Sequence, residues 1–322
     1  MKYVTFGTTG VQVSEMCLGT MMFGERCDES ESARILSACL DAGVNFVDTA
    51  ASYGKGRTEE IVGRIIKDKR DRIFLGTKVP QKTDSAWIRS SIDESLRRLQ
   101  VDYVDLYMIH WPRLKMDVTD MMAGLDAVVR SGKARFVGCC NFPAWLFAHC
   151  NAIAARNNWA PLVCNQIPYN LLERGVEVEV LPQAVAERIA ITVYRPLSMG
   201  VLAGKYRPGE PVPEDSRGAT DARPRAWLER YGEGIGKMLT FAADRGLHPA
   251  QVAVAWVKHS PGVTCPIVGA SSLGQVQATV KAFDIDFTDE EYAQLTAMFD
   301  TAVKEESGGN FVGLRRSFEL LA

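Results

Sequence analysis

Apolar residues along the chain follow two spacings that alternate. Short runs rich in Val, Ile and Leu, such as residues 104–109 and 191–194, are typical of buried strands. Between such runs, apolar residues recur every three or four positions, as they do across residues 35–40, which predicts amphipathic helices. Strands that alternate with helices are typical of a parallel sheet with right-handed crossovers.

The alternation begins after a short paired segment at the start of the chain. Residues 1–7 and 11–16, joined by Thr8-Thr9-Gly10, predict a β-hairpin. Asp28, three residues before Glu31, predicts a capping box at the start of the first helix. After the hairpin, the expected strands are residues 17–19, 44–48, 73–77, 104–109, 136–138, 162–165, 191–194 and 263–267.

Eight strands favour a closed (β/α)8 barrel of the TIM type, and we expect residues 1–322 to form one such domain. The main alternative, an open doubly wound sheet, usually carries a Gly-x-Gly-x-x-Gly turn after its first strand, and this sequence has none there. Segment 207–224 is rich in Pro, Gly, Asp and Arg, so we expect a long loop on the carboxyl-terminal face of the barrel.

Composition excludes several classes of function. A formal net charge of −2 gives no basis for binding nucleic acid or an anionic membrane, and no run approaches 18 apolar residues, so a cytoplasmic protein is expected. The eight cysteines form no Cys-x-x-Cys pair and are joined by only four histidines, which predicts buried free thiols and no metal site. Nothing in the composition indicates an oligomer.

Ionisable side chains stand where three successive predicted strands end. Asp48, Lys78 and His110 end these strands, and Tyr53 follows in the loop after the first of them. Taken singly, each has an ordinary structural reading as a helix cap, a solvated end, a rim histidine or a packing residue. Together they are harder to dismiss, because catalytic groups of a barrel lie at the carboxyl ends of its strands and desolvated charges must be paired.

The motifs around these residues resemble those of the aldo-keto reductases. Similar segments occur in the family's order from the amino terminus to about residue 300, which makes the resemblance specific. They are Gly43–Ala50 with Tyr53-Gly54, Thr77-Lys78, Asp105–Trp111, Gly132–Gly138 with Asn141-Phe142, Asn165-Gln166 with Tyr169-Asn170, Tyr194–Leu197 and Pro266–Ser272.

The resemblance implies a catalytic tetrad of Asp48, Tyr53, Lys78 and His110. Tyr53 would be the general acid in carbonyl reduction and the general base in alcohol oxidation, and His110 would orient the carbonyl oxygen. An ammonium group next to a phenol favours the phenolate, so Lys78 is expected to lower the pKa of Tyr53. Asp48 would hold Lys78 in place and keep it charged.

The resemblance also implies a nicotinamide cofactor, with NADP(H) expected and NAD(H) possible. Asn141 and Gln166 would bind the carboxamide, and Tyr194 would stack on the ring. The remaining cofactor contacts are expected at Gly19, Thr20, Asp48, Arg195, Pro196, Leu197, Gly200, Leu202, Lys205, Gly269, Ser271 and Gln275. Phosphate groups at such sites need backbone N–H groups, hydroxyls and cations more than a glycine fingerprint.

Several positions depart from the family's usual residues. Cys140 and Arg195 stand where serine is common, and the Arg195 guanidinium could bind a phosphate, bind a substrate carboxylate or only solvate the rim. The segment Gly269–Ser272 lacks the basic pair of one branch and resembles the branch of the potassium-channel β subunits, which also takes NADPH. The electrostatic basis for NADP(H) is therefore weaker than usual.

The expected substrate is a small carbonyl compound or alcohol, bound by Tyr53, His110, Met22, Phe23 and Trp111. Trp87 is a further candidate, with packing against a helix as the alternative. Two other functions stay open at this point: a sugar or polyol dehydrogenase that uses NAD, and a cofactor-bound sensor or scaffold.

Overall fold

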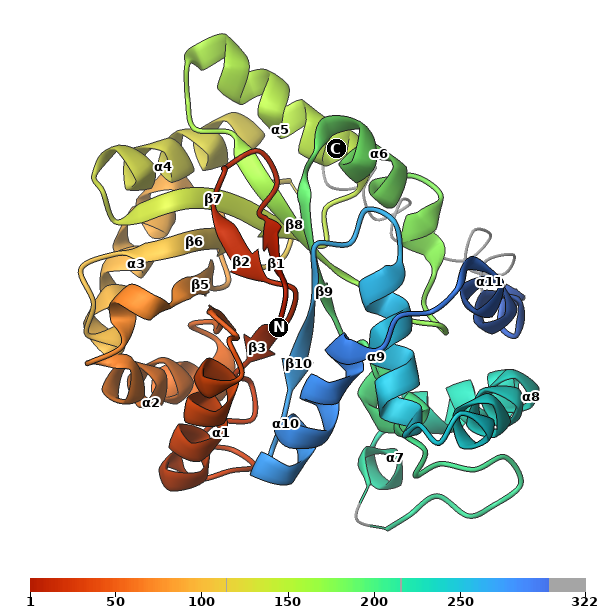
Figure 1. The fold of residues 1–322 in the computed structure, drawn as a ribbon. Helices are drawn as coiled ribbons and strands as arrows, with labels where there is room; N and C mark the ends of the chain where they lie inside the picture. Colours follow the sequence, from red (N-terminus) through yellow and green to blue (C-terminus); the bar gives the residue numbers. More distant parts are fainter. Residues whose placement is uncertain (114, 215, 301–322) are drawn as a thin grey trace.

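Eight parallel strands close into a barrel in the computed structural model, which describes residues 1–113, 115–214 and 216–300 (Figure 1). The barrel strands are β3 (Cys17–Gly19), β4 (Phe46–Asp48), β5 (Phe74–Val79), β6 (Val104–Ile109), β7 (Ala134–Cys140), β8 (Leu162–Pro168), β9 (Ala190–Tyr194) and β10 (Cys265–Gly269). Each strand pairs with the next in chain order, and β10 closes the ring by pairing with both β9 and β3. The predicted (β/α)8 barrel is thus confirmed, while residues 301–322 of the predicted single domain lie outside the described residues.

Helices surround the barrel in Figure 1. They are α1 (Glu29–Asp41), α2 (Arg57–Ile66), α3 (Ser85–Leu99), α4 (Val118–Arg130), α5 (Ala144–Asn157), α6 (Val180–Glu187), α7 (Arg217–Thr220), α8 (Ala222–Asp244), α9 (Pro249–His259), α10 (Leu273–Val280) and α11 (Asp289–Ala297). Short 3-10 turns are η1 (Tyr53–Gly56), η2 (Arg70–Arg72), η3 (Gly175–Glu177), η4 (Ser198–Ala203) and η5 (Lys281–Asp284). All six residues of β5 and of β6 are buried, as expected for strands with side chains in the barrel on one face and helices on the other.

Strand boundaries differ from the sequence prediction mainly at the strand ends. The strand at 104–109 is found as predicted, whereas β4 begins two residues later than expected and β7 extends beyond 136–138 at both ends. The last barrel strand is Cys265–Gly269 instead of 263–267, because the Val263 N–H donates to the Ser260 carbonyl in a turn. A β-branched residue in a turn has the same sequence pattern as one at the start of a strand.

The first helix begins as predicted but without a capping box. The Asp28 carboxylate accepts a hydrogen bond from the Glu31 N–H at 2.8 Å, so Asp28 is the N-cap. The Glu31 carboxylate, however, accepts from the Leu273 N–H at 2.7 Å instead of returning to the cap. The second half of the predicted motif therefore ties α1 to the first turn of α10.

The irregular segment expected at 207–224 ends earlier than predicted. The short helix α7 begins at Arg217, and α8 follows from Ala222 with Asp221 as its N-cap. Pro224 lies in the first turn of α8, where its missing N–H leaves no helical hydrogen bond unmade. Proline therefore accompanies a helix start here, not a loop.

The predicted hairpin, β1 (Tyr3–Thr5) with β2 (Gln12–Ser14), is present and lies across one end of the barrel (Figure 1). Phe6 packs against Phe46 and Phe74, with ring centroids 5.7 and 5.0 Å away. These two residues begin their strands, so the hairpin closes the amino-terminal end of the barrel. Gly7, with φ +55°, lets the chain approach β9, since a Cβ atom there would lie 2.9 Å from the Ala190 nitrogen.

All eight cysteines are buried free thiols, as predicted. Burial raises the pKa of Cys39, Cys150 and Cys164 to about 12, so these three thiols are protonated at neutral pH. Among the described residues, no helix has the length and apolar character needed to cross a membrane.

Asp105 at the start of β6 joins three segments at the hairpin end of the barrel. Its buried carboxylate accepts from the Leu75 N–H at 2.9 Å, from Arg70 at 2.8 Å and from Arg135 at 2.7 Å. The residue lies at the amino-terminal end of the barrel, where polar networks serve stability.

Replacing Asp105 with alanine is expected to lower the free energy of unfolding by about 2–4 kcal/mol, because a backbone N–H and two guanidinium groups lose their acceptor. Urea denaturation measures the loss. Asp93→Ala is the control, since the Asp93–Lys133 pair is largely exposed and its removal should cost less than about 1 kcal/mol. Equal losses for the two variants would show that the Asp105 network contributes nothing beyond a surface ion pair.

Candidate active site

The ammonium group of Lys78 lies inside the barrel with no exposed surface. It donates hydrogen bonds to Asp48 Oδ1, to Asp48 Oδ2 and to the Thr49 carbonyl, each at 2.7 Å. The two side chains come from the neighbouring strands β4 and β5, near their carboxyl ends. Such a buried charge is tolerated because it has a counterion and hydrogen-bond acceptors at contact distance.

Burial alone would lower the pKa of Lys78, but the Asp48 carboxylate outweighs it and holds this pKa above its ordinary value. Lys78 is therefore an ammonium ion at every physiological pH. The loop after β4 places Tyr53 next to it, with the Lys78 nitrogen 5.2 Å from the centre of the phenol ring.

The pKa of Tyr53 shifts in the opposite direction from the sequence expectation. Burial raises it to about 12, although Lys78 acts to lower it as predicted. Desolvation of the phenolate is the larger effect, and Asp48 also opposes a second negative charge nearby. In this structure Tyr53 is a protonated phenol at neutral pH.

His110, which directly follows β6, lies beside Tyr53 in an edge-on arrangement, with ring centroids 6.0 Å apart. Burial, assisted by the positive charges of Lys78 and Arg113, lowers the pKa of His110 to about 3. The imidazole is thus neutral at physiological pH. Ser52 Oγ lies 3.3 Å from Nδ1 and orients the ring. The sequence analysis missed Ser52, although its position directly before Tyr53 was a usable signal.

Three predicted cofactor ligands join the same cluster. The Gln166 amide donates to Asp48 Oδ1 at 3.0 Å, and the Tyr194 hydroxyl donates to Asn141 Oδ1 at 2.7 Å. The Asn141 amide in turn donates to the His110 carbonyl at 3.3 Å. The structure therefore brings together the side chains that end β4 to β9, although they are spread over more than 140 residues of sequence.

The segment after β9 has the properties of a phosphate-binding loop. Ser198, Met199 and Gly200 are consecutive residues with positive φ angles of 45°, 57° and 95°, and the Ser198 and Gly200 N–H groups donate to carbonyls within the turn. The Ser198 hydroxyl is buried and has no partner among the described residues. Lys205 crosses this turn, since a Cβ atom on Gly200 would lie 3.0 Å from its Cε. Pro196, Leu197 and Leu202 of the predicted set contribute backbone here, and the Leu202 side chain is buried in the core.

The predicted contacts at the start of α10 already bond to the protein. Gln275 accepts hydrogen bonds from the Ser271 N–H at 2.9 Å and from its hydroxyl at 3.3 Å. The Glu31 carboxylate accepts from the Leu273 N–H, so a negative charge already lies at this helix start. Gly269, at the end of β10, is exposed.

Arginines from distant segments meet near the β9 loop, and the sequence analysis did not foresee this. Arg217 Nη2 lies 3.5 Å from Met22 Sδ. Burial, with Arg26 and Arg195 nearby, holds the pKa of Arg217 below its usual range. In the described part of the chain, neither Arg217 nor Arg26 has a carboxylate within ion-pair distance, whereas Arg195 lies 3.9 Å from Glu173. Arginines with positive neighbours and no acid suit an anion.

The predicted substrate residues fall in different environments. Trp111 is 47% exposed next to His110, and Met22 is partly exposed. Phe23 is fully buried in the core, so its side chain does not reach the surface of the cleft as expected. The Trp87 indole donates to the Pro80 carbonyl and packs against the core, in agreement with the packing alternative.

Gly19 and Thr20 are buried below this cluster. A Cβ atom on Gly19 would lie 2.7 Å from the Ile267 side chain, and both the Thr20 N–H and its hydroxyl donate to the Asp48 carbonyl at 3.0 Å. Their contacts in this structure are with the protein, and they fix the strand that carries Asp48.

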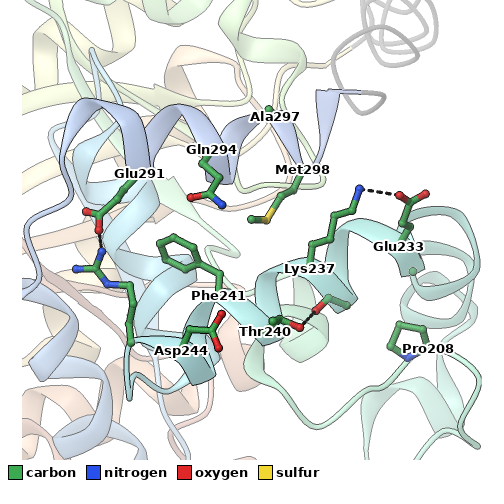
Figure 2. Close-up of a pocket in the computed structure, with 13 residues that line it drawn as sticks. Pro208, Glu233, Lys237, Thr240, Phe241, Asp244, Glu291, Gln294, Ala297 and Met298 are labelled. Atoms are coloured by element: carbon green, nitrogen blue, oxygen red, sulfur yellow. Dashed lines mark hydrogen bonds and ion pairs between the residues drawn. The ribbon is translucent and has the colours of Figure 1, made fainter.

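A separate groove of about 940 Å³ lies on the outside of the barrel, between α8 and α11 (Figure 2). Lys237, Phe241, Glu291 and Met298 are among its lining residues, and none of the predicted site residues line it. The candidate site is therefore the polar cluster at the barrel end, not this groove.

Comparison with known proteins gives a consistent result. The Aldo/keto reductase family profile matches residues 15–300. The chain is 30% identical to the aldo-keto reductase YhdN of Bacillus subtilis (strain 168), over 97% of this chain and 98% of that protein. It is 32% identical to a probable voltage-gated potassium channel subunit beta of Arabidopsis thaliana, over 88% and 92%. It is also 30% identical to norsolorinic acid reductase A of Aspergillus parasiticus, over 89% and 78%.

The barrel is closed, a buried Lys78–Asp48 pair lies under Tyr53 and His110, and the family profile matches most of the sequence. We conclude that the chain belongs to the aldo/keto reductase family of oxidoreductases.

Proposed function

We propose that this protein is an NADP(H)-dependent reductase of aldehydes and ketones in which Tyr53 is the general acid. The observation that supports this most directly is the buried Lys78 ammonium, held by Asp48 and lying 5.2 Å from the Tyr53 ring. Burying a charged ammonium group costs free energy, and placing it beside a phenol assists proton transfer from that phenol.

When bound, the reduced nicotinamide cofactor supplies the hydride. As the carbonyl carbon accepts it, negative charge develops on the oxygen, and the Tyr53 hydroxyl donates its proton there. Lys78 stabilises the phenolate that remains, and Asp48 keeps Lys78 charged. With Ser52 Oγ 3.3 Å from Nδ1, we assign the proton of neutral His110 to Nε2, from which it donates a hydrogen bond to the same oxygen without losing the proton.

The pKa of Tyr53 favours the reductive direction. A phenol with a pKa of about 12 is fully protonated at neutral pH and is ready to act as an acid. Alcohol oxidation needs the phenolate, which is rare at that pH. A polyol dehydrogenase would have to work with this small phenolate fraction at neutral pH, and tight binding of NADPH with negligible binding of NAD would exclude it.

Two observations bear on the choice of cofactor. The buried Ser198 hydroxyl, Lys205 and the arginines around Arg217 offer several donors for a phosphorylated cofactor, which favours NADP(H). One observation favours NAD(H) instead: the Glu31 carboxylate at the start of α10 would repel an added phosphate there. We propose NADP(H), with Arg217 as its main electrostatic determinant.

The exposed side chains next to Tyr53 and His110 suit an apolar carbonyl substrate. Trp111, which directly follows His110, is 47% exposed, and the predicted substrate residue Met22 is partly exposed, so both side chains are accessible to a substrate. Aromatic aldehydes are accordingly the first substrates to test.

The variant Tyr53→Phe is expected to reduce kcat for an activated aromatic aldehyde by about 10²- to 10⁴-fold, because the proton donor is lost. Loss of NADPH absorbance measures the rate. Tyr3→Phe is the control, since the Tyr3 hydroxyl donates only to the exposed Gly43 carbonyl at the other end of the barrel. Equal rates for Tyr53→Phe and wild type would refute the mechanism, and multiple turnovers by wild type would exclude a sensor or scaffold without catalysis.

Reduction is expected to be independent of pH between about 5 and 8, because His110 stays neutral above its pKa of about 3 and Tyr53 stays protonated below its pKa of about 12. The rate should fall only at strongly alkaline pH, while alcohol oxidation should rise there. A profile of kcat/KM against pH tests both limbs. An inflection near the ordinary histidine pKa of about 6.5 would contradict the neutral His110.

Arg217→Gln is expected to weaken NADPH binding by about tenfold or more and to leave NADH binding nearly unchanged, because in this proposal the lost charge is the one that binds the added phosphate. Fluorescence titration with each cofactor gives the two dissociation constants. Arg97→Gln, at a 67% exposed surface position, is the control. If both cofactors weaken equally, Arg217 does not set the preference.

A further inference from the structure

The segment Tyr169-Asn170, one of those that resemble the aldo-keto reductases, has no part in the chemistry above. Asn170 lies just after β8, and its side chain is completely buried. Its amide nitrogen donates to the Arg195 carbonyl at 3.1 Å and to Glu173 Oε2 at 2.9 Å. Its amide oxygen accepts from the backbone N–H groups of Leu172 and Glu173. One side chain thus connects the segment after β8 to the turn after β9.

The turn that Asn170 holds is strained. Arg195 has a φ angle of +59°, which is unfavourable for any residue with a Cβ atom. It also precedes Pro196, and a residue before proline prefers an extended conformation with negative φ. Such a conformation persists only where the surroundings impose it. The Arg195 carbonyl accepts from Asn170 and from the Ser198 N–H, and its guanidinium lies near Glu173 and over the Tyr194 ring.

The strained residue directly follows Tyr194. The Arg195 guanidinium carbon lies 5.2 Å from the centre of the Tyr194 ring, and the Tyr194 hydroxyl donates to Asn141 Oδ1 at 2.7 Å. Asn141 also has a positive φ angle, of 64°, and its amide donates to the His110 carbonyl. A continuous path of contacts thus joins Asn170, through Arg195 and Tyr194, to the backbone of a predicted catalytic residue.

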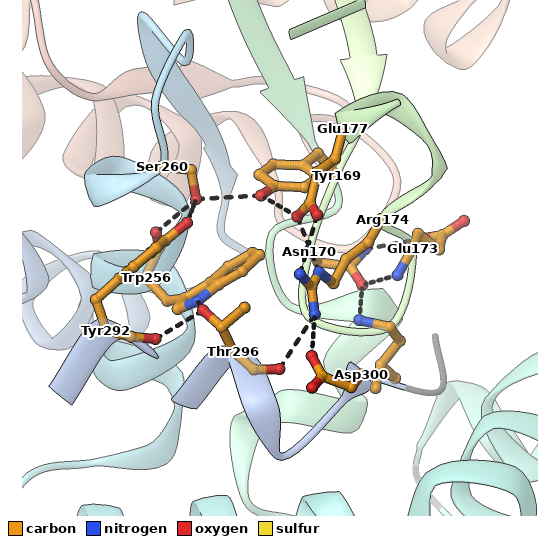
Figure 3. A network of polar contacts seen from close by, with 11 residues as sticks. Tyr169, Asn170, Glu173, Arg174, Glu177, Trp256, Ser260, Tyr292, Thr296 and Asp300 are labelled. Atoms are coloured by element: carbon orange, nitrogen blue, oxygen red, sulfur yellow. Dashed lines mark hydrogen bonds and ion pairs between the residues drawn. The ribbon is translucent and has the colours of Figure 1, made fainter. Parts of the chain in front are cut away.

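Asn170 is itself part of a rigid network (Figure 3). Arg174 is 5% exposed, and its guanidinium donates to both oxygens of Glu177 and to the Thr296 carbonyl near the end of α11. The Tyr169 hydroxyl donates to Glu177 at 2.7 Å. These contacts fix the segment that carries Asn170, which can then hold Arg195 against its own backbone preference.

We propose that Asn170 is a positioning residue, which holds the strained Arg195 turn so that Tyr194 and Asn141 present a fixed surface to the nicotinamide ring. This inference rests on the proposed function. It assigns Asn170 no contact with substrate or cofactor. Its effect should therefore appear in cofactor binding and in the fidelity of hydride transfer, not in the proton-transfer step.

The test is Asn170→Asp, which keeps the oxygen that accepts from Leu172 and Glu173 but replaces the amide donor to Arg195. We expect the dissociation constant for NADPH to rise about tenfold, with the aldehyde KM at saturating NADPH nearly unchanged. With NADPH deuterated on one face of C4, we expect wild type to transfer from one face only and the variant to transfer measurably from both. Asn170→Ser, a smaller change that keeps an acceptor oxygen, is the second variant if the first folds poorly.

Asn151→Asp is the matched control. Like Asn170, Asn151 bonds to the backbone through both its side-chain nitrogen and its side-chain oxygen, donating to the Leu162 carbonyl at 3.1 Å and accepting from the Leu162 N–H at 2.8 Å, away from the cluster. We expect it to lose stability without losing facial selectivity. If Asn170→Asp and Asn170→Ser lose only stability, as Asn151→Asp does, Asn170 is a structural residue and the inference is wrong.

A double-mutant cycle with Arg195→Gly tests the strain directly. Glycine adopts a φ angle of +59° without penalty, so Asn170→Asp should weaken NADPH binding clearly less in the Arg195→Gly background than in wild type. An equal loss in both backgrounds would overturn the proposal. If the wild-type protein binds NADPH and reduces the aldehyde, the proposed function is supported whatever the variants do. If the wild-type protein binds no nicotinamide cofactor, both the proposed function and the role of Asn170 are wrong.

Discussion

The arrangement of the whole site depends on one buried ion pair, between Lys78 and Asp48. The Lys78 ammonium has no contact with solvent, and its three acceptors come from Asp48 and Thr49 on the neighbouring strand. This pair requires β4 and β5 to be adjacent and in register, and their parallel pairing in the barrel provides this. The positive charge of Lys78 then acts on Tyr53 and His110, the two partly exposed side chains next to it.

Opposite ends of the barrel serve different purposes. At the amino-terminal end, the hairpin, Phe6 and the Asp105 network close the barrel with apolar packing and ion pairs, with Arg70 Nε as a buried atom that has no partner among the described residues. At the carboxyl-terminal end lie a left-handed backbone segment, the buried Ser198 hydroxyl and Arg217; within the described part of the chain this hydroxyl has no hydrogen-bond partner and Arg217 has no carboxylate partner. Features that weaken a fold are thus concentrated where a ligand would compensate for them, and the rigid opposite end stabilises the whole.

Electrostatics in the site depend on a balance that residue identity alone does not decide. Lys78 does favour the Tyr53 phenolate, as chemical intuition expects, but burial acts more strongly and raises the pKa of the phenol to about 12. For His110, burial and the nearby cations act in the same direction, and the imidazole remains neutral. Both outcomes suit an acid and a neutral hydrogen-bond donor, which is the combination that carbonyl reduction needs.

The sequence by itself determined the barrel and placed Asp48, Lys78 and His110 at the ends of strands, because strand and helix periodicity and the residues that end each strand are local properties of the chain. It misjudged the capping role of Glu31, the helix that begins before Pro224 and the exposure of Phe23, since each depends on a partner elsewhere. Only the tertiary structure decided how Arg217 approaches Met22, how Asn170 holds Arg195, and the direction of the Tyr53 pKa shift. Each of these depends on the distance between side chains that are far apart in sequence, or on how completely folding removes them from water. A pattern along the chain gives neither quantity.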